Sequence, residues 1–200
     1  KRRIYFPAFA IYLGYNQSVP ASKIFFPTAS CGLAIQKTFK KAVLNGLFEL
    51  IERDAAIRLW KKKIKPPKIN LSQIESEDLR KLIDNINAEG LKPEVLLSTQ
   101  DVHIPSVIGV VYNSEPSIPY VTFGLSAGID IESIIQKSLE EALMVRGSLE
   151  YLKKEGGPKA FHKTSSQVKT FFDHCLYYSM PERKENWQTT GRWETMDDLY

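Results

Sequence analysis

The residues best suited to chemistry in this chain lie between positions 45 and 53. An α-helix turns by about 100° per residue, so a helix here would gather its polar side chains on one stripe. That stripe consists of Asn45, Glu49, Glu52 and Arg53. The residues around it include Val, Leu, Ile and Phe, and a helix that is apolar all round is typical of a protein interior. Carboxylates in such a helix need a cation or an ionic partner, because an unpaired buried charge costs several kcal/mol.

The charged stripe has two interpretations. In the first, Arg53 neutralises one glutamate and the remaining negative charge binds a metal ion. In the second, the stripe is a structural ion network, because Glu49 lies four residues before Arg53, which is a favourable spacing for a helical ion pair. The stripe alone does not decide between them, since structural networks also bring charges together.

A second long helix, predicted over residues 131–154, carries further charges. An ordinary surface ion pair is one explanation of Lys137 and Glu141. If the two helices lie side by side, however, Glu141 joins Glu49 and Glu52 around one cation. Three carboxylates are hard oxygen ligands of the kind that Mg²⁺ prefers, and nearby basic side chains suit nucleotide phosphates. No Walker-type glycine-rich loop is present, so a nucleotide site would be built from helix side chains.

Length and composition place the chain among ordinary globular proteins. It has 200 residues, of which 43% are hydrophobic and 25% charged, and its net charge of +4 does not by itself indicate nucleic-acid binding. The two cysteines have no disulfide-framework spacing, and Cys and His show no zinc spacing. No apolar run approaches about 20 residues and no signal peptide is visible, so no membrane segment is predicted. The chain does not begin with Met, and we expect a fragment of a longer cytoplasmic protein.

Apolar periodicity and turn residues predict the elements that position these side chains. Helices are predicted over residues 37–60, 76–88, 131–154 and 166–172, and strands over 4–13, 23–27, 93–98, 105–112 and 120–125. A turn at 30–32 leads into the first long helix. Strands and long helices in this order predict an α+β fold, with long helices packed on a largely antiparallel sheet.

The Lys- and Pro-rich segment 61–68 follows the first long helix. Its two prolines cannot continue a helix, so it is predicted to be the helix exit. A solvated basic loop is favoured over a surface for an acidic partner, because most runs of charge are solvated.

Two motifs resemble those of the YcaO domain family, in particular its branch of azoline-forming cyclodehydratases and docking scaffolds of bacteriocin biosynthesis. The first family motif is Ser-x-x-x-Glu-x-x-Glu-Arg followed by Asp-Ala, and residues 45–55 match it except that Asn45 replaces Ser. The second motif, Glu-x-x-Gln, is similar to residues 141–144, where Met144 replaces Gln.

Two further segments extend the resemblance. Residues 26–34, which include Ser30, are similar to the family's Thr-Ser-x-Gly-x-Ala lead-in. Residues 172–182 also resemble that branch. The resemblance therefore covers most of residues 1–182 as part of a YcaO-like domain, and residues 183–200 are predicted to be a loop-rich tail.

The resemblance implies ATP- and Mg²⁺-dependent cyclodehydration of a peptide backbone, in which phosphorylation of an amide oxygen leads to a thiazoline or oxazoline. It implies that the Mg²⁺ ligands are Glu49, Glu52 and Glu141. It implies that ATP is contacted by Asn45, Arg53, Ser30, Lys137 and Arg146. No residue is assigned as catalytic, and the isolated chain is expected to be inactive.

The resemblance also implies partners. These are a precursor peptide, together with either an E1-like leader-binding protein and a flavin dehydrogenase or a TfuA-like protein. It leaves a homodimer open and implies no nucleic-acid or membrane partner. Two alternatives remain: a thioamide-forming relative, and a docking scaffold that binds peptide and partners without consuming ATP. Met144 favours the scaffold, because a thioether cannot replace the hydrogen bonds of Gln.

Overall fold

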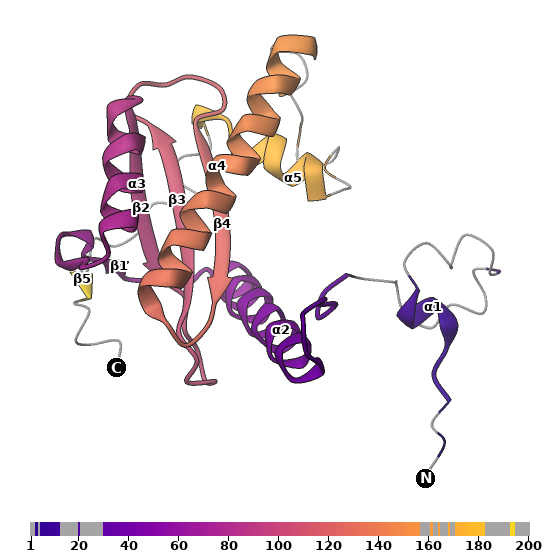
Figure 1. Cartoon of the computed structure of the whole chain (residues 1–200). Coiled ribbons are helices and arrows are strands. Elements are labelled where there is room, and N and C mark those ends of the chain that lie inside the picture. The colour runs from indigo at the N-terminus through magenta and orange to yellow at the C-terminus, as the bar shows by residue number, and fades with distance from the viewer. Residues whose placement is uncertain are drawn as a thin grey trace. The chain divides into compact units, whose positions relative to one another are not determined.

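The structure is a computed structural model that describes residues 3, 5–12, 20, 30–156, 161, 164, 168, 171–182 and 193–194 (Figure 1). The chain forms two compact units, Lys1–Leu50 and Ile51–Tyr200. The elements are α1 (Ala8–Ile11), α2 (Phe39–Lys62), β1 (Lys68–Ile69), the 3₁₀ helix η3 (Leu71–Gln73), α3 (Glu77–Ala88), β2 (Leu91–Leu97), β3 (Ser106–Asn113), β4 (Val121–Ala127), α4 (Ile131–Gly156), α5 (Phe171–Tyr178) and β5 (Trp193–Glu194).

Helix α2 confirms the first long helix predicted from the sequence. It ends at Lys62, and Lys63 has a positive φ of 53°. The amide of Ile64 then donates to Leu59 O over 3.0 Å, which satisfies one of the last carbonyls of the helix. The Pro pair at 66–67 follows, as expected for a segment that cannot continue a helix.

The prediction that α2 is buried on every side is wrong for the described chain. Its apolar side chains with 42–83% of their surface exposed are Phe39, Val43, Leu44, Leu47, Leu50, Ile57 and Trp60. Gly46, Ala55 and Leu59 are buried. An apolar sequence permits burial all round a helix, but burial also requires neighbouring elements all round, and the described residues cover only part of α2.

The sheet has the strand order β4-β3-β2-β1-β5, and β2, β3 and β4 form an antiparallel meander. These three strands confirm the strands predicted between residues 93 and 125, with ends shifted by one or two positions. The short β1 pairs antiparallel with β2, and the two-residue β5 pairs in parallel with β1. The sheet is therefore largely antiparallel, as predicted.

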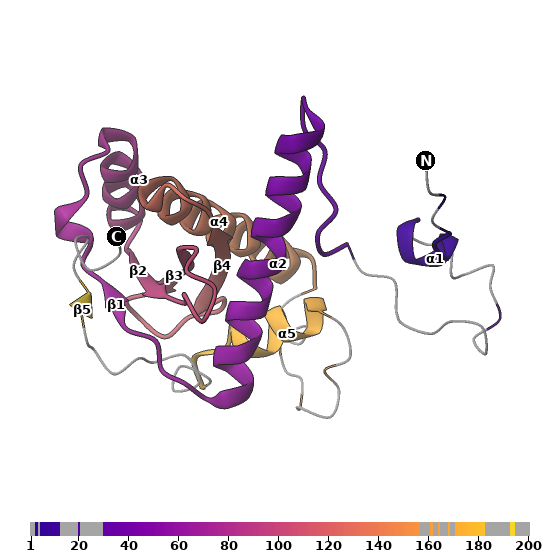
Figure 2. The ribbon, with the colours of Figure 1, turned by 90° about the horizontal axis from the view of Figure 1, so that it is seen from below.

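Helices α3 and α4 cover one face of this sheet, α3 against β2 and α4 against β3 and β4 (Figures 1 and 2). The carboxylate of Asp130 accepts from Ser133 N over 2.8 Å and so caps the start of α4. The fully or nearly fully buried residues of this interface include Leu79, Val95, Val107, Val111, Ile131, Ile135, Leu139 and Ala142. This arrangement confirms the α+β class.

Helix α3 is fixed at its start by two side chains. Ser76 Oγ accepts from Leu79 N over 3.3 Å, which is the usual cap of a first turn. The Glu132 carboxylate of α4 accepts from Glu75 N over 2.6 Å and from Ser76 N over 2.9 Å. The α3–α4 contact therefore joins a capped helix start to the beginning of the next long helix.

Several predicted elements differ from the structure. The predicted strand 4–13 contains the short helix α1 instead, because β-propensity describes the fit to a sheet and no strand among the described residues pairs with this segment. Residue 68, predicted in a loop, begins β1, since Leu97 N donates to Pro67 O over 2.9 Å. The predicted strand 23–27 lies outside the described residues.

The helix predicted over residues 166–172 begins later in the structure, as α5. Its buried residues Leu176 and Tyr177 pack in one cluster with Leu149 of α4 and with Phe161. This tertiary contact joins α5 to the second half of α4. In the predicted loop-rich tail, the two described residues form β5.

Candidate functional site

In the first unit, Glu49 is held by the turn that precedes α2. Gly32 N donates to Glu49 Oε2 over 3.1 Å, and Leu33 N closes the turn on Ser30 O over 3.0 Å. A Cβ on Gly46 would stand 2.5 Å from Gly32 O, so only glycine lets the turn lie this close to the helix. Gly32 itself has a φ of +83°, a conformation that favours glycine. The turn predicted at 30–32 is thereby confirmed, and it aims a backbone N–H at a predicted metal ligand.

The rest of the stripe on α2 is less buried than predicted. Asn45 is exposed, and Glu49, Glu52 and Arg53 are half-buried. Ser30, in the turn, is exposed. The correction follows from the partial covering of α2, which leaves its polar stripe accessible to solvent.

In the second unit, Glu141 is held by the end strand of the sheet. Leu125 N donates to Glu141 Oε2 over 2.6 Å. Within the described part of the chain, β4 is the last strand of the sheet and pairs only with β3, and the Glu141 carboxylate accepts from a backbone N–H of this strand. Glu141 is half-buried, at the border between the packed and the exposed sides of α4.

Close approach of α4 to the sheet depends on Gly124. A Cβ on Gly124 would overlap Ser138 O and stand 2.7 Å from Ala142 N and 2.8 Å from Glu141 Cβ. Gly109 lies opposite Gly124 in the ladder, and a Cβ there would stand 2.6 Å from Ser138 Oγ. The cross-strand glycine pair therefore allows the backbone of α4 to pack closely against β3 and β4.

The exposed side of α4 carries two other residues singled out in the sequence. Lys137 lies one turn before Glu141 and is exposed. Met144, which replaces the family's Gln, is 72% exposed. Residues four and three positions from Glu141 lie on the same side of a helix, so Lys137, Glu141 and Met144 share one stripe.

Arg146 lies in a structural network within the second unit and is 8% exposed. Its Nη1 donates to Pro119 O over 3.1 Å, its Nη2 donates to Asn113 Oδ1 over 2.7 Å, and its Nε pairs with Glu150 at 2.9 Å. Burial lowers the pKa of Arg146, and Glu150 opposes that shift. These contacts join α4 to the β3–β4 connection and account for the burial of Arg146. Its predicted contact with ATP stays a prediction.

Among the described residues, no three His, Cys, Asp or Glu side chains form a group that could hold a metal ion. Glu49 belongs to the first unit, and Glu52 and Glu141 belong to the second. The shared cation therefore stays a prediction. Within the same described part, no helix is both long and apolar enough to cross a membrane.

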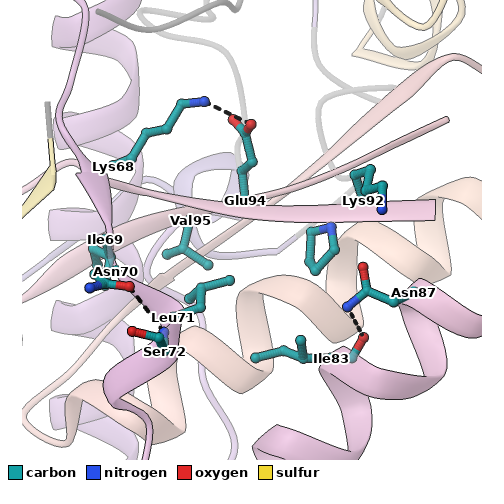
Figure 3. A pocket seen from close by; sticks show the side chains of 11 residues that line it. Lys68, Ile69, Asn70, Leu71, Ser72, Ile83, Asn87, Lys92, Glu94 and Val95 are labelled. Atoms are coloured by element: carbon teal, nitrogen blue, oxygen red, sulfur yellow. Dashed lines mark hydrogen bonds and ion pairs between the residues drawn. The ribbon is translucent and has the colours of Figure 1, made fainter. Parts of the chain in front are cut away.

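A cavity of about 290 Å³ lies elsewhere in the second unit and contains none of the predicted site residues (Figure 3). It is lined by Lys68, Ile69, Asn70, Leu71, Ser72, Ile83, Asn87, Lys92, Pro93, Glu94 and Val95. At one side of it, Lys68 Nζ pairs with Glu94 Oε1 at 2.7 Å, as the dashed line in Figure 3 marks. Tyr112 OH donates to the same oxygen over 2.9 Å. Burial, followed by the charge of Glu94, raises the pKa of Tyr112.

Sequence reasoning missed the glycines and backbone amides that hold the two glutamates. One signal was available for Gly46, because a glycine inside a helix costs about 1 kcal/mol relative to alanine and so suggests a close approach. Gly124 in a strand interior gave a similar signal. The amides of Gly32 and Leu125 gave none, since every residue except proline carries a backbone N–H.

The fold places the chain in a class of domains found in heterocyclases. It is similar to a heterocyclase in complex with substrate and cofactor, with a TM-score of 0.76 and 22% identity, over 97% of this chain and 24% of that chain. It is also similar to the YcaO protein of Methanopyrus kandleri bound with AMPPCP and Mg²⁺, with a TM-score of 0.62 and 21% identity, over 89% of this chain and 43% of that one. At these identities the likeness shows the fold.

The family is shown by sequence. The family model described as YcaO cyclodehydratase, ATP- and Mg²⁺-binding, matches residues 1–200, and the chain belongs to this family. A protein of Methanothermobacter thermautotrophicus is 23% identical over 71% of this chain and 37% of its own length. A protein encoded in the tfuA 3′ region of Rhizobium leguminosarum bv. trifolii is 35% identical over 43% of this chain and 21% of its own length. The chain thus spans well under half of these relatives.

Proposed function

We propose that this chain contributes to ATP- and Mg²⁺-dependent cyclodehydration of a peptide backbone. In this reaction a Cys, Ser or Thr side chain of the substrate peptide adds to the preceding carbonyl carbon, and the former carbonyl oxygen takes the γ-phosphoryl group of ATP. That oxygen then leaves with the phosphate. The products are ADP, phosphate and a thiazoline or oxazoline, so the peptide loses one water in net terms.

The donor chemistry of the candidate residues fits Mg²⁺. Glu49, Glu52 and Glu141 are the proposed ligands, and carboxylate oxygens are what this ion takes from proteins. When bound, the ion would neutralise phosphate charge as phosphoryl transfer proceeds. Two of the three carboxylates, those of Glu49 and Glu141, are already oriented by backbone N–H groups. An oriented carboxylate binds a cation at a lower entropic cost than a mobile one.

The remaining candidate residues would bind the nucleotide. Asn45, Arg53, Ser30 and Lys137 offer hydrogen-bond donors and positive charge toward ATP. Arg146 is the least suited of the proposed contacts, because its guanidinium already binds Pro119 O, Asn113 and Glu150. We therefore assign Arg146 the role of holding α4 in place, with nucleotide contact as its secondary role.

The observation that carries the proposal is the similar support of the two glutamates. Glu49 on α2 and Glu141 on α4 each lie half-buried at a helix surface, and each accepts a backbone N–H from a segment that a glycine, Gly46 or Gly124, allows to lie close to the helix. Two such carboxylates, in a chain that belongs to an ATP- and Mg²⁺-binding family, favour a metal–nucleotide role over a structural ion network.

Two specific observations favour alternatives. The relative encoded beside tfuA favours a thioamide-forming enzyme with a TfuA-like partner, in which external sulfide replaces the side-chain nucleophile. The exposed thioether of Met144 favours a docking scaffold, because it removes the family's polar side chain next to Glu141. For the cyclodehydratase we propose a precursor peptide with an E1-like leader-binding protein and a flavin dehydrogenase as partners.

One reaction mixture tests these possibilities. The protein, its precursor peptide, ATP and Mg²⁺ are combined with the partner proteins, and phosphate release is measured together with the peptide mass. A cyclodehydratase releases phosphate as the peptide loses water, and Glu49→Gln abolishes both because it removes ligand charge at nearly unchanged volume. A thioamide-forming enzyme needs sulfide and exchanges oxygen for sulfur. Absence of peptide-dependent phosphate release, with Glu49→Gln indistinguishable from the parent, would establish the scaffold.

A further inference from the structure

The two half-buried glutamates, one in each unit, are held by the same device. Glu49 receives the N–H of Gly32, and the turn that carries this amide lies against α2 only because Gly46 has no side chain. Glu141 receives the N–H of Leu125, and α4 lies against β4 only because Gly124 has none. In each unit a glycine permits the close approach, and a backbone amide then fixes a carboxylate oxygen.

The second unit shows the device in most detail. Gly124 precedes the donor residue Leu125 in β4, and the space in which its Cβ would lie is occupied by the backbone of α4 and by Glu141 Cβ at 2.8 Å. A side chain at 124 would therefore push on the helix at the residue that carries the carboxylate. Such a shift would lengthen the 2.6 Å bond between Leu125 N and Glu141 Oε2.

A purely structural explanation covers part of this geometry. An end strand exposes unpaired N–H groups, and a carboxylate can satisfy one of them. Just before β4, for example, Tyr120 N donates to Ser179 O over 2.6 Å. The acceptor in that hydrogen bond is a neutral backbone carbonyl, whereas the acceptor for Leu125 N is an acidic side chain at the family's metal-ligand motif.

We propose that Gly124 with the Leu125 amide, and Gly46 with the Gly32 amide, are positioning groups that orient Glu141 and Glu49 for the cation. This inference rests on the proposed function. An N–H bound to one carboxylate oxygen fixes the plane of the group and directs the other oxygen toward a ligand. Groups that orient metal ligands in this way typically contribute about 10- to 100-fold to metal affinity.

The test compares two glycines that support the same helix. Gly124→Ala places a Cβ against Ser138 O, Ala142 N and Glu141 Cβ, whereas Gly109→Ala, its cross-strand partner, has its three nearest contacts all with Ser138 and none of them with Glu141. Both substitutions crowd α4, so both lower the melting temperature. Binding of Mn²⁺, used in place of Mg²⁺, is measured by electron paramagnetic resonance with a non-hydrolysable ATP analogue present. We expect roughly 10- to 100-fold weaker Mn²⁺ binding for Gly124→Ala and an unchanged affinity for Gly109→Ala.

The outcomes separate the inference from the function on which it rests. If the unsubstituted protein binds no Mn²⁺ with the analogue, the proposed function fails and the inference fails with it. If it binds Mn²⁺ and the two alanine variants lose affinity equally, the positioning role alone is overturned. Excess metal should restore binding to Gly124→Ala but not to Glu141→Gln, because only the latter removes a ligand charge. Should Gly124→Ala not fold, replacing the Leu125 amide by an ester removes the N–H without adding a side chain, and the same Mn²⁺ affinity is measured on that variant.

Discussion

Replacement of Arg146 by methionine separates the two roles assigned to this residue. Arg146 is predicted from sequence to contact ATP, yet its buried guanidinium binds Asn113 Oδ1 at 2.7 Å and Pro119 O at 3.1 Å. Arg146→Met keeps most of the volume of the side chain and removes both bonds. The two acceptors are left without this donor in a region closed to water.

The expected loss of stability follows from those contacts. Each hydrogen bond to a charged group contributes about 1.5–3 kcal/mol, so two of them give a loss of about 3–5 kcal/mol when non-additivity is allowed for. The contact with Glu150 adds little, because that carboxylate is half-exposed and such pairs contribute about 0–1 kcal/mol. Glu150→Gln is therefore the matched control, with a change below about 1 kcal/mol.

Urea unfolding followed by circular dichroism measures this difference, and nucleotide affinity is measured on the same variants. We expect Arg146→Met to lower the unfolding midpoint strongly and to change nucleotide affinity only as far as folding is impaired. A variant with nearly unchanged stability and a large loss of nucleotide affinity would refute the structural assignment. Arg146 would then be a nucleotide contact whose bonds to Asn113 and Pro119 matter little.

Three further predictions follow from the second unit. Ser76→Ala should lower the free energy of unfolding by about 1 kcal/mol in urea titrations, because it removes the cap on Leu79 N. The free energy of unfolding should fall as the pH rises above about 10, the ordinary pKa of tyrosine. Above this pH Tyr112 ionises in the unfolded state, whereas its raised pKa keeps it neutral in the folded state, so Tyr112→Phe should flatten the alkaline slope. Lys68→Met should cost about 1–3 kcal/mol, less than the loss of a fully buried pair, by leaving the half-buried Glu94 without its cation, and Lys68→Met with Glu94→Leu should recover most of that loss in the same assay.

The sequence by itself determined the long helices and the central strands. The segments that form α2 and α4 are long, rich in helix-forming residues and free of proline, so local signals agree over many turns. The strands β2 to β4 were equally readable, since turn residues separate apolar runs. The family motifs around Glu49 and Glu141 were also visible without coordinates.

Short elements were decided by tertiary structure, because their local signals are weak. α5 packs Leu176 and Tyr177 in one cluster with Leu149 and Phe161, and β1 pairs with β2. The burial of α2 was misjudged for a related reason. Hydrophobic composition describes what a helix can bury, whereas the covering elements determine what it does bury.

The same distinction between local sequence and tertiary contacts applies to the candidate site. Side-chain chemistry and helical spacing identified Glu49, Glu52 and Glu141 as candidate ligands, because residue type and period are written in the sequence. The amides that hold two of them could not be identified in that way, since a backbone N–H is common to all residues except proline and acquires a role only from its position. Only the folded chain brings Gly32 N to Glu49 and Leu125 N to Glu141, through contacts between segments separated by 17 and 16 residues.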